Sequence, residues 1–229
     1  MYADYFEKPL PEEHLRKLSV EAQEFENQIL SIGKRLRYVY QREKRGFGHA
    51  VYQAAQFAGN EPVLLLLGDT LYRSDSNKPC ALQMVEEYER HNALMVSIHP
   101  IPLGEVSRYG ILSGVWEDKA GSVLNVTTMY EKPKVNYAEE FLGVRNKKGE
   151  KEYYSVFGQY ILTPEVFAQL HEDIMQAEID EDRVREIELT SALEKVRQRS
   201  GMIGIRLNGR MYDMGNPSAL VKAVEAFSQ

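Results

Sequence analysis

The chain has very little cysteine, no long apolar run and no excess of positive charge, and each lack excludes a class of protein. Cys80 is the only cysteine among 229 residues, so an intrachain disulfide and a cluster of several thiolate metal ligands are excluded. No apolar stretch approaches the roughly 20 residues that a bilayer-spanning helix needs, and the first residues are acidic and aromatic, unlike a secretory signal. A net charge of -6 disfavours a protein that coats nucleic acid. We therefore expect a cytoplasmic protein with neither membrane nor nucleic acid among its partners.

The hydrophobic content is ordinary, at 43% of the residues, with 27% charged. A chain of this length and composition can bury a real core, so residues 1–229 are expected to form a single domain. The charge is uneven, because six of the twelve positions from Lys34 to Arg45 are lysine or arginine. This run leads into Gly46 and a helix-like segment from His49, which is typical of a phosphate or base site. A solvated basic loop is the alternative, and the sequence leaves both open.

The apolar run from Val63 to Leu67, followed by Gly68 and Asp69, is the strongest structural signal in the chain. Five apolar residues in a row are typical of a strand that helices bury on both faces, as in parallel sheets. Asp69 would then lie at the carboxyl edge of the sheet, where ligands bind in open α/β folds. Hard cations prefer carboxylate oxygens, which makes Asp69 a candidate metal ligand.

Apolar periodicity and turn residues predict an alternation of helices and strands. Helices are expected over 11–31, 49–57, 79–91, from 163 onward, 188–198 and 216–227, and strands over 37–40, 63–67, 94–99, 153–162 and 202–207. Segments 109–115 and 123–130 are typical of an antiparallel hairpin, and 136–152 of a solvent-facing excursion. The alternation indicates an α/β fold: a mostly parallel mixed sheet with flanking helices and a small antiparallel β element.

Seven short motifs occur in one order along the chain, and none is decisive alone. They are YVYQREKRGFGHAV at 38–51, LLLLGDT at 64–70, RYGIL at 108–112, YEKPK at 130–134, FGQYILTPEVF at 157–167, REIELTSAL at 185–193 and YDMGNP at 212–217. Together they resemble the sugar-phosphate nucleotidyltransferases, most of all the bacterial type of UTP:glucose-1-phosphate uridylyltransferase, also called UDP-glucose pyrophosphorylase. The resemblance implies a Rossmann-like nucleotidyltransferase fold, a cytoplasmic enzyme and Mg²⁺ as cofactor. It also implies that UTP and glucose 1-phosphate give UDP-glucose and pyrophosphate.

The resemblance assigns four residues to the nucleotide and the metal. Gln41 stands where the family places the glutamine that reads the pyrimidine base, and Gly46 where a backbone lies against that base. Asp69 and Asp213 match the two acidic Mg²⁺ ligands. For each residue alone a plainer interpretation exists, namely a surface glutamine, a turn glycine or a capping aspartate. A single glutamine can pair with either uracil or thymine, so the alternative of a thymidylyl-type enzyme stays open.

The resemblance assigns three residues to the sugar phosphate. Glu131 corresponds to the acceptor of the sugar hydroxyls, Lys132 to the partner of the phosphate and candidate catalytic residue, and Gly110 to a backbone beside the sugar. Neighbours on an ideal strand point to opposite faces. Glu131 and Lys132 can therefore reach one ligand only if the strand ends or bulges at Pro133. An exposed Glu-Lys pair and a hairpin glycine are the alternatives.

The chain departs from the family pattern at its start. Members open with a strand and a loop of the form GxGTRxxPxTK, which cradles the triphosphate, and the 229 residues contain no such loop. We expect the fold to lack this first strand-loop-helix unit and the chain alone to have little activity. It is then either a uridylyltransferase whose N-terminal piece is missing or supplied by another chain, or a non-catalytic module that binds sugar nucleotides weakly. A metal-dependent glycosyltransferase is a third interpretation, disfavoured by Thr70, which is not an acid. The family also implies self-association.

Overall fold

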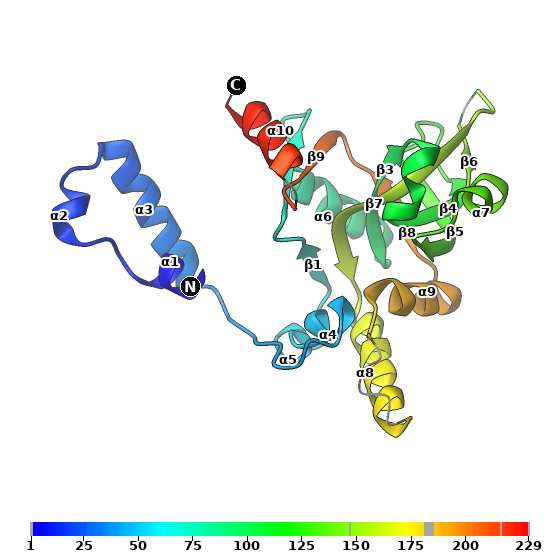
Figure 1. The fold of residues 1–229 in the computed structure, drawn as a ribbon, viewed down its shortest axis with the longest axis horizontal. Coiled ribbons are helices and arrows are strands. Elements are labelled where there is room, and N and C mark those ends of the chain that lie inside the picture. The colour runs from blue at the N-terminus through cyan, green and yellow to red at the C-terminus, as the bar shows by residue number, and fades with distance from the viewer. Residues whose placement is uncertain (1, 147, 181–185, 216, 229) are drawn as a thin grey trace. The chain divides into compact units, whose positions relative to one another are not determined.

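The computed structural model describes residues 2–146, 148–180, 186–215 and 217–228. By their internal contacts the residues form two compact units, Met1–Arg42 and Glu43–Gln229. The single domain expected from the sequence stays a prediction. The helices and strands of both are labelled in Figure 1.

The N-terminal unit is helical. Its helices are α1 (Tyr2–Glu7), α2 (Glu12–Leu15) and α3 (Val20–Gly33). The helix expected over 11–31 is interrupted, because Ser19 caps α3 by accepting a hydrogen bond from the backbone N–H of Ala22 (3.3 Å). The strand expected over 37–40 is wrong, since those residues carry no regular structure. The described part of this unit has no second strand with which they could pair.

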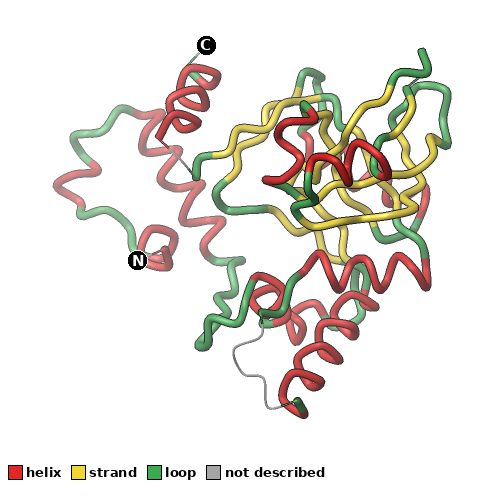
Figure 2. The backbone as a smooth tube through the Cα atoms, turned by 45° about the vertical axis from the view of Figure 1, so that its right-hand side comes forward, coloured by secondary structure: helices red, strands yellow, loops and turns green. Residues whose placement is uncertain are grey.

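The main unit contains all the strands that the structure describes. Its elements, in chain order, are α4 (Phe47–Tyr52), α5 (Ala55–Ala58), β1 (Val63–Leu66), β2 (Thr70–Ser74), α6 (Cys80–His91), β3 (Met95–Ile101), the 3₁₀ helix η1 (Leu103–Arg108), β4 (Gly110–Trp116), β5 (Val123–Glu131), α7 (Val135–Phe141), β6 (Val144–Arg145), β7 (Lys151–Leu162), α8 (Pro164–Ile179), α9 (Leu189–Ser200), β8 (Ile203–Arg206), β9 (Gly209–Asp213) and α10 (Pro217–Phe227). In Figure 2 the yellow strands lie among these helices.

The main sheet is mixed, but it is not mostly parallel as expected. Its strand order is β1-β7-β3-β8-β5-β4, with β6 and β4 also pairing with β7. Among the described pairings only β3 with β8 is parallel. The cause is β7, which runs antiparallel to β1, β3, β4 and β6 and separates strands that share one direction. The hairpin expected at 109–130 is confirmed as β4 and β5.

Strand β1 is less buried than the sequence predicts. The run Val63–Leu65 is only half-buried, and Leu66 is 48% exposed. Among the described strands β1 pairs with β7 alone, so it is an edge strand of the sheet. An edge strand has one neighbour fewer to cover its side chains, which explains why an apolar run here is not buried on both faces.

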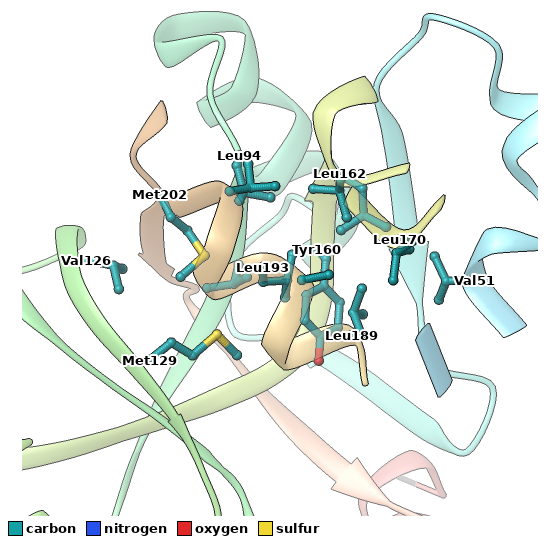
Figure 3. Packing of buried hydrophobic residues seen from close by; sticks show 14 of the residues in the cluster. Val51, Leu94, Val126, Met129, Tyr160, Leu162, Leu170, Leu189, Leu193 and Met202 are labelled. Atoms are coloured by element: carbon teal, nitrogen blue, oxygen red, sulfur yellow. The ribbon is translucent and has the colours of Figure 1, made fainter. Parts of the chain in front are cut away.

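Helices cover both faces of the sheet. Leu162 and Tyr160 of β7 pack against Leu170 of α8 and Leu189 of α9, as Figure 3 shows. On the opposite face Met84 of α6 joins a second cluster of buried residues. The flanking helices predicted from the sequence are therefore confirmed.

Removing the Leu162 side chain tests this core. Leu162 is fully buried, so Leu162→Ala is expected to lower the free energy of unfolding by about 2–5 kcal/mol, since a cavity replaces lost contacts. Leu82→Ala is the matched control, because Leu82 is 44% exposed on α6, and we expect a loss below about 1 kcal/mol. Urea unfolding measures both. Equal losses in the free energy of unfolding for Leu162→Ala and Leu82→Ala would contradict the burial of Leu162 in the core.

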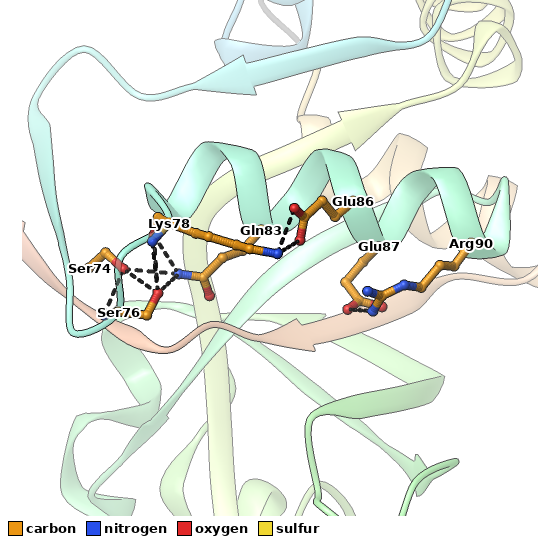
Figure 4. Close-up of polar contacts among 7 residues, drawn as sticks. All are labelled: Ser74, Ser76, Lys78, Gln83, Glu86, Glu87 and Arg90. Carbon is orange, nitrogen blue, oxygen red and sulfur yellow. Dashed lines mark hydrogen bonds and ion pairs between the residues drawn. The ribbon is translucent and has the colours of Figure 1, made fainter.

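Strands β2 and β9 form a separate small antiparallel ribbon, in two segments where no strand was expected. Figure 4 shows how its β2 end is tied to α6: the Gln83 amide donates to Ser74 Oγ (3.1 Å) and lies beside Ser76, while Lys78 pairs with Glu86. These contacts hold the strand that follows Asp69 in place.

Among the described residues no helix is both long enough and apolar enough to span a bilayer.

Candidate functional site

A cavity of about 590 Å³ in the main unit opens beside the ends of β1 and β5. It gathers three of the residues predicted from the sequence, Asp69, Gly110 and Glu131. Its other lining residues are Phe47, Leu66, Leu67, Gly68, Thr70, Arg108, Tyr109, Val156, Gly158, Tyr160, Thr190 and Met211. Segments far apart in the sequence thus meet at one pocket.

Asp69 lies in the turn between β1 and β2, with its side chain exposed to the pocket. Thr70 Oγ1 donates to Asp69 Oδ1 (3.3 Å), and the backbone N–H of Met214 donates to the Asp69 carbonyl oxygen (2.8 Å). Thr70 also pairs with Asp213 in the β2–β9 ladder. The backbones of the two predicted metal ligands are therefore close neighbours, although the Asp213 side chain lies outside the described residues.

These residues suit a hard cation. Mg²⁺ prefers oxygen ligands and is commonly held by one or two carboxylates together with substrate phosphates and water. Asp69 offers an exposed carboxylate at the pocket, and the ladder brings a second aspartate beside it. The described residues contain no group of three or more His, Cys, Asp or Glu arranged around one metal position. The arrangement fits a cation shared with a phosphate ligand, and the metal assignment stays a prediction.

Glu131 is held in place from two sides. It is the last residue of β5 and pairs with Gly110 of β4. Thr190 Oγ1, at the start of α9, donates to Glu131 Oε2 (2.9 Å). A Cβ atom at Gly110 would lie only 3.1 Å from the same oxygen, so glycine leaves room for the carboxylate. The geometry presents an oriented hydrogen-bond acceptor to the pocket.

The backbone of Lys132 explains how Glu131 and Lys132 can reach one ligand, although neighbours on an ideal strand point to opposite faces. Strand β5 ends at Glu131, and Lys132 has φ 46°, in the left-handed region that non-glycine residues rarely adopt. Its N–H donates to the Tyr109 carbonyl oxygen (3.1 Å), and its Nζ lies 3.6 Å from Glu131 Oε1. The two side chains are thus side by side rather than on opposite faces. Lys132 itself is not among the pocket's lining residues, although its neighbour is.

The two residues predicted to bind the base lie outside this pocket's lining. Gly46, with φ 91°, precedes α4, and its backbone lies against Ile187: a Cβ atom there would be 2.8 Å from the Ile187 carbonyl oxygen. Gln41 belongs to the N-terminal unit. Their base contacts therefore stay predictions. Arg45, from the basic run, is buried and lies 3.6 Å from Glu178, which indicates a structural role.

Several lining residues were assigned no role from the sequence, among them Thr190, Arg108 and Tyr160. Thr190 is inside the REIELTSAL motif, and Arg108 is the first residue of the RYGIL motif, so both lay within recognised signals. Arg108 is exposed and forms no ion pair with any described residue. Tyr160 is buried, and this burial, with the nearby Glu131 charge, raises the pKa of its phenol. The pocket therefore combines two carboxylates, a guanidinium that is unpaired among the described residues, and a neutral phenol.

Sequence comparison supports the resemblance. A family model described as nucleotidyl transferase matches residues 12–229. The UTP–glucose-1-phosphate uridylyltransferase of Staphylococcus epidermidis is 32% identical over 185 residues, covering 81% of this chain and 57% of that protein. The enzyme of the same name from Streptococcus pneumoniae serotype 4 is 33% identical over 190 residues, covering 82% of this chain and 57% of that protein. The chain thus spans little more than half the length of these relatives.

Structural comparison agrees. An apo UDP-glucose pyrophosphorylase is similar with a TM-score of 0.79 at 27% identity, over 99% of this chain and 76% of that one. A UDP-glucose pyrophosphorylase solved with UDP-glucose is similar with a TM-score of 0.74 at 26% identity, again over 99% of this chain and 76% of that one. Together with the family match over 12–229, these similarities show that the chain belongs to the nucleotidyl transferase family.

Proposed function

We propose that the pocket holds the sugar-phosphate part of UDP-glucose, and that the chain is the sugar-binding and metal-holding part of a UTP:glucose-1-phosphate uridylyltransferase. The observation that carries this is the end of strand β5, where Glu131 lines the pocket and the Lys132 side chain lies directly beside it. A carboxylate that accepts from sugar hydroxyls and an ammonium that pairs with a phosphate are the two groups a sugar phosphate needs. The similarity to a pyrophosphorylase solved with UDP-glucose supports the same choice.

The reaction is a nucleotidyl transfer. A phosphate oxygen of glucose 1-phosphate forms a bond to the α-phosphorus of UTP, the bond from that phosphorus to the pyrophosphate oxygen breaks, and pyrophosphate leaves. Such chemistry depends mainly on positioning and on neutralising negative charge, so no nucleophilic side chain is needed. Mg²⁺, held by Asp69 and Asp213, would stabilise charge on the phosphate oxygens.

Each residue then has a defined part. Glu131, oriented by Thr190, fixes the hexose through its hydroxyls. Lys132 and Arg108 place positive charge near the sugar phosphate and keep the attacking oxygen in position. Gly110 lets the sugar and the Glu131 carboxylate approach the β4 backbone closely. Gln41 and Gly46 would read the uracil base.

Two alternatives remain beside this proposal. The first is a non-catalytic module that binds sugar nucleotides weakly, because the glycine-rich phosphate loop is not among the 229 residues. The second is a thymidylyl-type enzyme, which differs only in the base. Two rates separate the proposal from both alternatives: the pyrophosphate-dependent formation of UTP from UDP-glucose, and the corresponding formation of thymidine triphosphate from the thymidine sugar nucleotide. A non-catalytic module forms neither product.

Lys132→Gly is the sharpest test of the proposed role. Glycine adopts positive φ without strain, so the free energy of unfolding should stay within about 1 kcal/mol of the original chain. In a form that carries a glycine-rich loop, turnover should fall about tenfold to a hundredfold because a charged contact to phosphate is lost. Pyrophosphate exchange with UDP-glucose measures the turnover.

Asn92→Gly is the matched control for this test. Asn92 is the other described non-glycine residue with positive φ, at 47°, and it ends α6 away from the pocket. Its replacement removes the same kind of strain but no phosphate contact, so turnover should not change. Equal turnover of the Lys132→Gly and Asn92→Gly variants would show that Lys132 has only a backbone role.

A further inference from the structure

We propose that a second cavity in the main unit binds a small free nucleotide, through cationic side chains and an aromatic wall. This cavity measures about 480 Å³. Residues of the turn between β4 and β5, of the segment between β6 and β7 and of the end of β8 line it. None of these residues lines the pocket of the proposed uridylyl transfer.

Four cationic side chains line this cavity, in a chain whose net charge is -6: Lys119, Arg145, Lys148 and Arg206. Among the residues that the structure describes, none of the four has an ion-pair partner. Arg145 Nη1 donates to the Gly149 carbonyl oxygen (2.8 Å), which leaves the rest of its guanidinium for a ligand. A concave surface with several unpaired cations attracts phosphate groups.

The acidic side chains of the cavity are already satisfied by hydrogen bonds. Asp118 accepts from Ser122 Oγ (2.7 Å) and from two backbone N–H groups, and although burial raises its pKa, these bonds bring that pKa down to about 2. Glu152 accepts from the Tyr154 hydroxyl (2.5 Å) and from Asn146 Nδ2 (2.9 Å), and these bonds, together with the positive charge of Arg206, lower its pKa. Glu150, the third acid of the lining, accepts from Asn146 Nδ2 (3.1 Å). Among the residues that the structure describes, none of these three carboxylates forms an ion pair with the four cations, so the cations stay available to a ligand.

An aromatic wall favours a nucleotide over a bare anion. Trp116 and Tyr154 meet edge to face, with ring centroids 5.3 Å apart, and both line the cavity. Tyr154 is fully buried and supports the half-buried indole. A planar base that stacks on an aromatic side chain gains about 1–3 kcal/mol. Cations and an indole in one cavity thus match a phosphate chain joined to a base.

Trp116 allows the two cavities to be studied separately. Gly110, in the first pocket, and Trp116, in the second, are the two ends of β4. Six residues of strand span about 20 Å, so a ligand in the first pocket does not touch the indole. Trp116 is the only tryptophan of the chain, and its fluorescence therefore reports on the second cavity.

Titration of the 229-residue chain with ADP, followed by Trp116 fluorescence, tests the proposal. Binding should saturate, and pyrophosphate, which has the phosphates without the nucleoside, should bind about tenfold more weakly. Arg206→Gln should weaken ADP binding about tenfold, because a charge-assisted contact is lost. Arg206 is exposed and its side chain contacts no described partner by hydrogen bond, so this variant should keep its fold. Arg90→Gln, on α6, is the matched control and should bind as the original chain does.

Three results would overturn the proposal. The first is the absence of a saturable change with ADP in a folded protein. The second is equal affinity of Arg206→Gln and the original chain, which would place the nucleotide elsewhere. The third is equal affinity for ADP and pyrophosphate, which would reduce the cavity to an anion site without base recognition. Because Arg206 and Trp116 lie outside the first pocket, these results are independent of the proposed transfer reaction.

Discussion

Asp69→Ala is expected to abolish Mg²⁺-dependent turnover in a form of the protein that carries a glycine-rich phosphate loop. Asp69 presents its carboxylate at the pocket, and the β2–β9 ladder brings the backbone of Asp213 beside it. A metal that neutralises phosphate charge is worth several kcal/mol in the transition state, so the rate should drop by about a thousandfold or more. Asp213→Ala should have the same effect.

Pyrophosphate exchange with UDP-glucose at increasing Mg²⁺ measures this loss. Thr70→Val is the matched control, because it removes the hydroxyl that donates to Asp69 but keeps both carboxylates. Its turnover should stay within about tenfold of the original, as expected for one neutral hydrogen bond. Near-normal rates for either aspartate variant would remove that residue from the metal site.

The 229 residues by themselves are expected to turn over UDP-glucose at least about a thousandfold more slowly than a form with a glycine-rich loop ahead of residue 1. Backbone N–H groups and cations of such a loop stabilise the leaving pyrophosphate, and no segment of this sequence has the GxGTRxxPxTK pattern. Pure 229-residue protein is incubated with UDP-glucose, pyrophosphate and Mg²⁺, and UTP is quantified.

The loop can be supplied in two ways to complete this experiment. Fusion ahead of residue 1 tests whether the chain is the remainder of a transferase, and addition as a separate fragment tests supply by another chain. Restored turnover in either case supports the transferase. Robust UTP formation by the 229 residues alone would show that they hold the triphosphate by other means. Continued inactivity with binding of UDP-glucose would favour the non-catalytic module.

Local sequence patterns predicted the elements of the fold better than their pairing. The helix at Cys80–His91 and the strand at Lys151–Leu162 were expected within a few residues, because each carries its own periodic apolar pattern. Strand direction was wrong, since the position of β7 between β1 and β3 depends on contacts far apart in the sequence. The ribbon of Thr70–Ser74 with Gly209–Asp213 was missed, because both segments are short and neither contains an apolar run.

Residues of the candidate pocket could be predicted where a strand end or a motif marks them. Asp69 follows an apolar run, and Glu131 stands two positions before Pro133, which suggested an end of the strand. The left-handed conformation of Lys132 could only be stated as a condition, because a single non-glycine residue gives no local signal for positive φ. The bond from Thr190 to Glu131 joins residues 59 positions apart and depends on how α9 packs against β5.

A crystal that contains both the metal and UDP-glucose tests the central claim, that Asp69, Asp213, Glu131 and Lys132 form one site, most directly. Mn²⁺ replaces Mg²⁺ in crystals of the loop-bearing form with UDP-glucose, and its anomalous signal locates the metal. We predict one metal position between the Asp69 and Asp213 carboxylates, with the hexose hydroxyls on Glu131 and the sugar phosphate on Lys132. A hexose bound away from Glu131, or a metal that contacts neither aspartate, would contradict the proposed site.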